Sequence, residues 1–407
     1  MLKNIGPAIL IFCLTALSAG AAFAADGASN EDLLRARELS KSVNAFAFDL
    51  YKEIAKEEKG SIFFSPLSIS MALALAYEGA AGETREEMRR VLHYDDNVGK
   101  QFRAYLNILN NTTKESGELI LASAVWPDST LKLRKKYIHD ITKYYSSEIS
   151  QLNFSQSQQS ADEINIWTNK QTRGKIQTIV SPRDIGNSAL VLTNAAYFKG
   201  EWRDKFNEQL TKEKEFFTSP KEVKKIPFMN KKGTLAYYED DTLQCIKLPF
   251  KNNLYSLAVI LPSKWEYQEL ITKTLNLKKF STIVSQLKSE KVNLYLPKYS
   301  ETKRYTKISK YLSSLGMKRA LGNLADFRNI MESPSRDRLY IQNIIHKSTF
   351  DIDEAYTEAS AATAVGMTFT STSLKRDHYI EFNANRPFLY FILDDNSMIL
   401  FIGRYCE

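Results

Sequence analysis

The sequence is poor in the residues that cross-link a fold or bind a metal. Its 407 residues include three cysteines and four histidines. Cys13 lies in an N-terminal apolar segment, so only Cys245 and Cys406 remain, too few to hold a fold of this size together. Whether those two pair is left open by the sequence. We find no Cys/His metal spacing, HExxH, GxSxG or phosphate-binding glycine loop, and we expect no metal and no cofactor.

Long hydrophobic runs are also missing. The apolar segment Ile9 to Leu17 is too short to span a bilayer, and no later stretch is long enough either. Lys3 precedes this segment and Ala22-Phe23-Ala24 follows it, which is the pattern of a signal peptide and its cleavage site. We predict that residues 1–24 are removed and that residues 25–407 are exported, either secreted or periplasmic.

Charge of one sign is not concentrated anywhere along the chain. The net charge of +8 comes from 55 basic and 47 acidic residues that are interleaved, whereas a nucleic-acid-binding face would be clustered. The densest basic group could bind an anionic polymer, an alternative that the sequence leaves open: Lys132, Arg134, Lys135 and Lys136. We expect no nucleic-acid partner and no membrane partner.

Hydrophobic periodicity predicts helices mainly in the first half and strands mainly in the second. The predicted helices cover residues 31–57, 67–78, 134–146, 160–173, 266–273, 278–287 and 305–316, with another opening at a capping box, Thr84 to Glu87. The predicted strands cover residues 61–64, 119–125, 190–198, 214–217, 224–229, 234–239, 243–249, 254–261, 292–296, 341–351, 388–393 and 398–403. Ser65 before Pro66 is expected to cap the second helix. This order, with no repeat and no linker, predicts one mixed α+β domain.

One long stretch of small and hydroxylated residues, 353–376, lies just ahead of the last two predicted strands. It opens with acidic residues, and from Thr357 to Val365 its side chains alternate with a period of two, so that small residues fall on both faces. A flexible surface linker is one interpretation. A segment that becomes a strand is the other, because a loop this long inside a compact domain is usually functional or disordered.

Several motifs in this chain resemble those of the serpins, a family of serine protease inhibitors. They occur in family order from about residue 40 to residue 405: Phe64-Ser65-Pro66-Leu67-Ser68-Ile69, Glu78-Gly79-Ala80-Ala81-Gly82-Glu83-Thr84, Leu192-Thr193-Asn194-Ala195-Ala196-Tyr197-Phe198-Lys199-Gly200-Glu201-Trp202, Ile345-His346-Lys347, Phe382-Asn383-Ala384-Asn385-Arg386-Pro387-Phe388 and Leu400-Phe401-Ile402-Gly403-Arg404. The resemblance implies three β-sheets, about nine helices and an exposed reactive-centre loop at about residues 354–380.

The resemblance also implies a mechanism. Inhibitory serpins are suicide substrates: a protease forms an acyl-enzyme on the loop, and the cleaved loop then inserts into the central sheet and carries the protease away. The family positions beneath that sheet, called the shutter, correspond to Ser65, Ser68, Asn194 and His346. Trp202 corresponds to the residue where the loop first inserts. The implied partner is a serine protease bound covalently, with papain-like cysteine proteases as a further target class, and the inhibitor itself is expected to be a monomer.

Within the loop, the resemblance assigns the hinge and the bond that is cleaved. The hinge residues are Glu354, Tyr356, Thr357, Glu358, Ala359, Ser360, Ala361, Ala362 and Thr363. Glu354 through Thr370 is a stretch of 17 residues, the family's usual count to the scissile bond, which places cleavage at Thr370–Ser371 and favours an elastase-like or broad target. Cleavage after Phe369 would suit a chymotrypsin-like protease, and cleavage after Lys375 or Arg376 a trypsin-like one.

Tyr356 departs from the family pattern, because a glycine is usual two residues after the hinge glutamate. A bulky ring there could slow insertion. A non-inhibitory serpin that acts as a binding module therefore remains an alternative, and an unrelated secreted hydrolase that depends on His346 is a third. We expect no catalytic residue in this chain.

Overall fold

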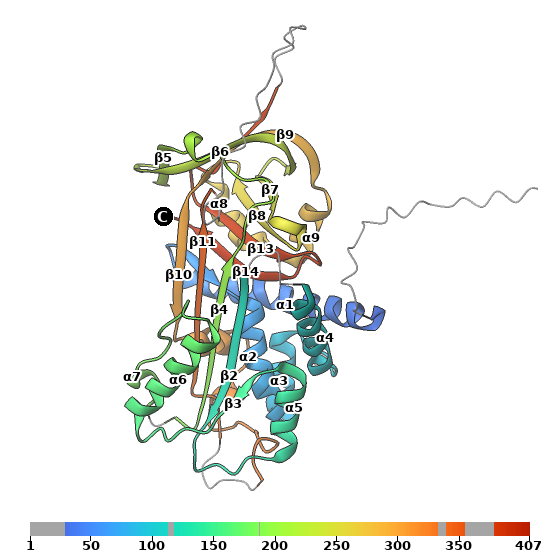
Figure 1. Cartoon of the computed structure of the whole chain (residues 1–407), viewed down its shortest axis with the longest axis vertical. Helices are drawn as coiled ribbons and strands as arrows, with labels where there is room; N and C mark the ends of the chain where they lie inside the picture. Colours follow the sequence, from blue (N-terminus) through green and yellow to red (C-terminus); the bar gives the residue numbers. More distant parts are fainter. Residues whose placement is uncertain (1–28, 113–117, 187, 333–338, 355–377) are drawn as a thin grey trace, which may run out of the picture.

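The computed structural model describes residues 29–112, 118–186, 188–332, 339–354 and 378–407, and Figure 1 shows how their elements are arranged. The described α-helices are α1 (Asn30–Glu57), α2 (Pro66–Gly79), α3 (Gly82–Leu92), α4 (Val98–Thr112), α5 (Lys135–Tyr145), α6 (Ser157–Gln171), α7 (Pro182–Ile185), α8 (Tyr267–Thr274), α9 (Leu277–Ser285) and α10 (Ile308–Ser314). The same described ranges hold three short 3-10 helices, at Glu208–Leu210, Lys251–Asn253 and Arg319–Leu321.

One five-stranded sheet runs along the molecule, with α6 and α7 near one end of it (Figure 1). Its strands, in spatial order, are β10 (Tyr299–Tyr305), β11 (Asn343–Ile352), β4 (Leu190–Lys199), β2 (Glu118–Pro127) and β3 (Glu148–Ile149). The central pair, β11 and β4, is parallel, whereas β10 is antiparallel to β11 and β2 is antiparallel to β4. The two central strands come from distant parts of the chain.

The remaining strands of the described residues form a nine-stranded sheet. Eight lie in the order β1 (Ile62–Phe64), β14 (Ile399–Tyr405), β13 (Phe388–Asp394), β8 (Tyr255–Pro262), β7 (Leu243–Pro249), β6 (Glu222–Glu239), β9 (Lys288–Pro297) and β12 (Ile380–Asn383), and β5 (Lys212–Ser219) pairs with β6. The long strand β6 pairs with β5 through its first half and with β7 through its last four residues. The resemblance implied three sheets. Two of them are joined here into this nine-stranded sheet, because β6 is hydrogen-bonded to strands of both.

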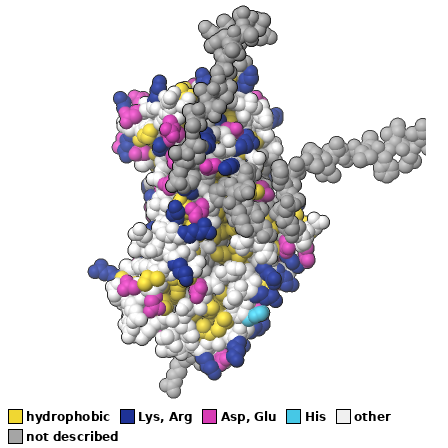
Figure 2. Space-filling model, viewed as in Figure 1, with side chains coloured by type: hydrophobic (Ala, Val, Ile, Leu, Met, Phe, Trp, Pro, Cys, Tyr) yellow, Lys and Arg dark blue, Asp and Glu magenta, His cyan; other side chains and the backbone are white. Residues whose placement is uncertain are grey.

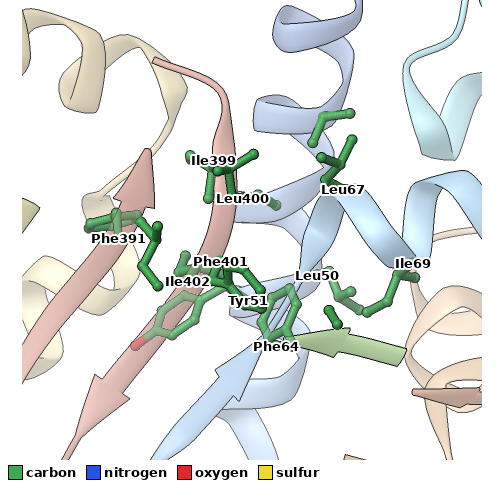
Figure 3. Close-up of a cluster of buried hydrophobic side chains, with 14 of the residues drawn as sticks. Leu50, Tyr51, Phe64, Leu67, Ile69, Phe391, Ile399, Leu400, Phe401 and Ile402 are labelled. Carbon is green, nitrogen blue, oxygen red and sulfur yellow. The ribbon is translucent and has the colours of Figure 1, made fainter. Parts of the chain in front are cut away.

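Helix α2 lies at the centre of the fold. Thirteen of its fourteen residues are buried, because apolar side chains occupy nearly every position of its surface. Ser65 caps it by accepting a hydrogen bond from the backbone N–H of Ser68, and Pro66 stands in the first turn, as predicted. Figure 3 shows Leu67 and Ile69 of α2 in the same cluster of buried side chains as Phe401 of β14 and Leu50 of α1. This core fixes α2 against the sheets, so its first turn is a rigid platform.

Two local predictions were wrong. The segments 224–229 and 234–239 form one continuous strand, β6, because β9 pairs with it across the whole interval from Phe228 to Tyr237. Thr84 does not cap a helix: α3 already begins at Gly82, and the Thr84 hydroxyl instead accepts the backbone N–H of Asp326 at 2.9 Å. In both cases a long-range contact overrides the local pattern.

On the face seen in Figure 2, basic and acidic side chains are mixed, and neither kind gathers into one continuous patch. Within the described ranges, no helix is long and apolar enough to cross a membrane. Cys245 and Cys406 are both free thiols, and burial raises the pKa of Cys245 to about 12. Burial therefore keeps Cys245 protonated and unreactive.

Candidate functional site: the seam between β4 and β11

The candidate site is the seam between the two central parallel strands. β11 pairs directly with β4 along eight residues, from Asn343 opposite Val191 to Phe350 opposite Phe198. Both strands also pair on their outer sides, β11 with β10 and β4 with β2. Because every seam hydrogen bond lies between strands that keep a partner on the other side, the seam can open without leaving either strand isolated.

A buried hydrogen-bond network crosses the middle of the seam at the predicted shutter residues. His346 and Asn194 lie opposite each other, and the Nδ1–H of His346 donates to the Oδ1 of Asn194. The hydroxyl of Ser68 donates to the same oxygen at 3.2 Å. The backbone N–H of Ser65 donates to Nε2 of His346 at 3.0 Å, and its hydroxyl donates to the carbonyl of Leu400 at 2.7 Å. The network therefore ties both seam strands to the fixed first turn of α2.

This network needs a neutral histidine. Nε2 accepts a hydrogen bond, so the single ring proton of His346 must lie on Nδ1. Burial lowers the pKa of His346 to about 3, because a charged ring would have no solvent around it. The Nδ2 group of Asn194 is buried and has no hydrogen-bond partner among the residues that the structure describes. A donor at the seam thus has no acceptor while the seam is closed.

A second set of contacts holds the chain at the upper end of the seam, where β11 ends. The indole of Trp202 stacks on Phe250 with ring centroids 4.5 Å apart, and its Nε1–H donates to the carbonyl of Asp353 at 2.7 Å. The backbone N–H of Phe206 donates to the carbonyl of Glu354 at 3.1 Å. Trp202 and Phe206 therefore fix the backbone of Asp353 and Glu354, at the start of the predicted hinge.

The side chain of Glu354 is anchored as well. Glu354 is only 5% exposed. Its carboxylate accepts a hydrogen bond from Nζ of Lys298 at 2.7 Å and another from the hydroxyl of Thr211 at 2.7 Å. Burial by itself would raise the pKa of Glu354, but these two bonds outweigh it and keep the pKa below its ordinary value. Glu354 is thus a charged, paired residue at the root of the loop.

The other predicted loop residues lie outside the described residues. They are the hinge positions Tyr356, Thr357, Glu358, Ala359, Ser360, Ala361, Ala362 and Thr363, the predicted scissile pair Thr370 and Ser371, and the alternatives Phe369, Lys375 and Arg376. The structure brings Ser65, Ser68, Asn194 and His346 into one network and places Trp202 and Glu354 together where the chain leaves β11.

Sequence reasoning missed the partners of Glu354 and the lower end of the seam. Lys298 and Thr211 stand among many similar surface residues, and only the fold brings them to Glu354. Gln342 and Asn343, just before and at the start of β11, also contact Ala189 and Ser188, the two residues just before β4. The predicted strand 341–351 pointed to this region, but its pattern gave no signal for a side-chain contact. In the described parts of the chain, no cluster of three or more His, Cys, Asp or Glu side chains could hold a metal ion.

Comparison with known proteins agrees with this architecture. The family model described as "Serpin (serine protease inhibitor)" matches residues 41–407. The chain is 37% identical over 370 residues to an uncharacterized serpin-like protein of Thermococcus kodakarensis, covering 89% of this chain and 84% of that protein. It is 32% identical over 380 residues to the leukocyte elastase inhibitor of Xenopus tropicalis, covering 90% of this chain and 98% of that protein.

A solved structure gives the same result. Serpin48, a highly specific serpin of the insect Tenebrio molitor, superposes with a TM-score of 0.79 at 31% identity, covering 91% of this chain and 98% of that one. These comparisons agree with two features of the structure: the parallel pair β11–β4 within the five-stranded sheet, and the hydrogen-bond network at the predicted shutter residues. The chain belongs to the serpin family, whose members are generally protease inhibitors.

Proposed function

We propose that this protein irreversibly inhibits serine proteases as a suicide substrate, by inserting its cleaved loop between β4 and β11. The observation that carries the proposal is the closed, directly paired seam with its hinge glutamate anchored at the upper end. A seam that pairs directly can still accept a strand, and the new strand would gain backbone hydrogen bonds on both sides. The target protease would be held as a covalent acyl complex with a single copy of the inhibitor.

The length of the loop fits this mechanism. The 17 residues from Glu354 to Thr370 would span roughly 55 Å as a strand, at about 3.3 Å per residue. That distance would carry a bound protease from one end of the domain toward the other and distort its active site. The energy would come from ladder hydrogen bonds and burial that the uncleaved protein lacks.

We propose Thr370–Ser371 as the scissile bond, with an elastase-like or broad-specificity serine protease as the target. The leukocyte elastase inhibitor of Xenopus tropicalis, by its name, acts on such a protease, and this chain is 32% identical to it. Papain-like cysteine proteases are a further target class. Cleavage after Lys375 or Arg376 would lengthen the inserted segment, so trypsin-like enzymes should cleave the loop without efficient trapping.

The test is to mix the protein with elastase-like, chymotrypsin-like, trypsin-like and papain-like proteases and to analyse each mixture by denaturing electrophoresis. We expect a covalent complex with the elastase-like enzyme, and mass spectrometry of the released fragment should begin at Ser371. Thr363→Arg should convert the protein into a substrate, because Thr363 is expected to face the sheet interior after insertion. Ala364→Arg, on the opposite face, is the matched control and should still trap. Cleavage by every protease without any complex would refute inhibition.

A non-inhibitory binding module is the second candidate, favoured by Tyr356 in place of the usual glycine. It predicts that cleavage of the loop leaves the melting temperature unchanged, whereas insertion should raise it by tens of degrees. Tyr356→Gly should give or speed trapping if the ring only hinders the hinge of an inhibitor, whereas a binding module should trap no protease with either residue.

We also propose that the protein is exported after removal of residues 1–24. The basis is the signal-peptide pattern at the N-terminus. N-terminal sequencing of the protein recovered from the medium or periplasm should read from Ala25. Recovery of an uncleaved chain inside the cell would contradict this.

A further inference from the structure

The lower end of the seam is closed by side chains below the last backbone hydrogen bond between β11 and β4. The backbone register of β11 with β4 begins at Asn343, opposite Val191. Below it, the N–H of Gln342 still reaches the carbonyl of Leu190 at 3.2 Å. Further down the side chains take over. Oε1 of Gln342 accepts the backbone N–H of Ala189, and Nδ2 of Asn343 donates to the hydroxyl of Ser188 at 3.1 Å. We call Gln342, Asn343, Ser188 and Ala189 the lower clasp.

The β4 side of the clasp is fixed from behind. The carbonyl of Ala189 accepts the backbone N–H of Asp128 at 3.0 Å, and the next residue, Leu190, pairs with Pro127 of β2. Ala189 therefore faces β2 with its carbonyl and the seam with its N–H. Ser188 is only 5% exposed. If β11 moves away, both groups lose their partners until another strand supplies new ones, so the clasp opposes opening of the seam.

The clasp lies at the depth that an inserted loop reaches last. The inserted strand would run antiparallel to β11, entering beside Ile352 and advancing one residue for each residue of β11. With Thr357 beside Ile352, this count brings Met367 level with Gln342. Residues up to Val365 would lie above the clasp, and Gly366 to Thr370 would reach and pass it. That last stage is about 17 Å of travel at about 3.3 Å per residue.

We propose that Gln342 and Asn343 are positioning residues that keep the lower end of the seam closed until the last stage of insertion, and thereby set how much protease is trapped. This inference rests on the proposed function. While the clasp delays the last stage, water can attack the ester between the protease serine and the Thr370 carbonyl, which frees the serine hydroxyl and leaves a carboxylate on the loop. Slower passage of the clasp therefore means more cleaved inhibitor for each protease trapped.

Synthetic peptides test the clasp without any protease. A peptide of residues 357–370 should insert past the clasp, whereas a peptide of residues 357–365 should stop above it. We expect Gln342→Ala and Asn343→Ala each to speed insertion of the long peptide by roughly fivefold, which is the effect of losing about one net hydrogen bond. The rate for the short peptide should stay unchanged. Equal acceleration of both peptides, or of neither, would overturn the inference. Ser188→Ala removes only one bond of the clasp and serves if the other variants fail to fold.

The matched control is Asn44→Ala. Asn44 of α1 also makes two hydrogen bonds, to the carbonyl of Ser397 at 2.9 Å and from the N–H of Ile399 at 2.7 Å, and neither crosses the seam. This variant should lower the melting temperature without changing the rate for either peptide. With a trapped protease, the clasp variants should lower the number of inhibitor molecules consumed per complex. If no protease is trapped at all, the proposed function fails, while the peptide result still decides the role of the clasp.

Discussion

The neutral state of His346 makes a quantitative prediction about pH. The pKa of His346 is about 3 in the folded protein, whereas an unfolded histidine has a pKa of about 6.5. Between these values the unfolded chain binds the proton and the folded protein does not. The free energy of unfolding therefore decreases as the pH falls below about 6.5. At pH 5.0 the loss from this one residue should be about 2 kcal/mol, at about 1.36 kcal/mol per pH unit. Above pH 7 its contribution is fully present.

A second buried group acts in the opposite direction and must be separated from the first. Burial, followed by the charge of Asp395, raises the pKa of Asp394 to about 7. The folded protein therefore holds a proton on Asp394 between about pH 4 and pH 7, and this group favours folding as the pH falls. Between pH 7 and pH 5 its contribution is about 2.7 kcal/mol, so a pH series on the wild-type protein alone would not isolate the contribution of His346.

The assay is therefore a comparison of variants by urea unfolding of the uncleaved protein at pH 5.0, 6.0 and 7.5. The stability of wild type minus that of His346→Gln should shrink by about 2 kcal/mol between pH 7.5 and pH 5.0, because glutamine does not titrate. The stability of wild type minus that of Asp394→Asn should grow over the same range. An identical pH dependence in wild type and His346→Gln would refute the account of a neutral buried histidine.

Three further substitutions test other parts of the structure. Lys298→Ala leaves the buried carboxylate of Glu354 without its cation, and in urea unfolding it should lower the free energy of unfolding by about 1 kcal/mol. Lys273→Ala is the control: its partner Glu269 is exposed, so the free energy of unfolding should change by less than about 0.5 kcal/mol. Gly403→Ala would place a methyl group 2.2 Å from the buried ring of Tyr390 and should cost about 1–3 kcal/mol in the same assay. Trp202→Phe keeps the stacking but loses the bond to Asp353, so hydrogen exchange at the end of β11 should become faster; unchanged exchange would contradict the anchoring role.

The sequence was informative where local chemistry decides the structure. Ser65 before Pro66 predicted the capped start of α2, and the apolar run after it predicted a buried helix. Asn194 and His346 are 152 residues apart, and only the family resemblance put them in one site, where the structure then joined them by a hydrogen bond. Periodicity cannot show such a pairing, because it describes which face a residue occupies and not which distant strand lies beside it.

Other features depend on contacts that local patterns do not encode. Thr84 has the spacing of a helix cap but bonds Asp326, which is 242 residues away. The two predicted strands within Glu222–Glu239 merge because β9 pairs along both. The partners of Glu354 and the lower clasp are ordinary polar residues whose role comes from position alone. A sequence pattern can identify the moving loop, but the contacts that restrain the seam are visible only in the fold.

The central claim is that the β4–β11 seam must open for inhibition, and a reversible cross-link tests it most directly. Lys347 and Ala195 lie opposite each other across the seam, so cysteines at both positions have strand spacing compatible with a disulfide. Cys406→Ser removes the less buried native thiol, and Cys245 is fully buried. We expect the oxidised Ala195→Cys/Lys347→Cys protein to be cleaved and released as a substrate, and the reduced protein to form the covalent protease complex again. Equal trapping by the oxidised and the reduced protein would contradict the account.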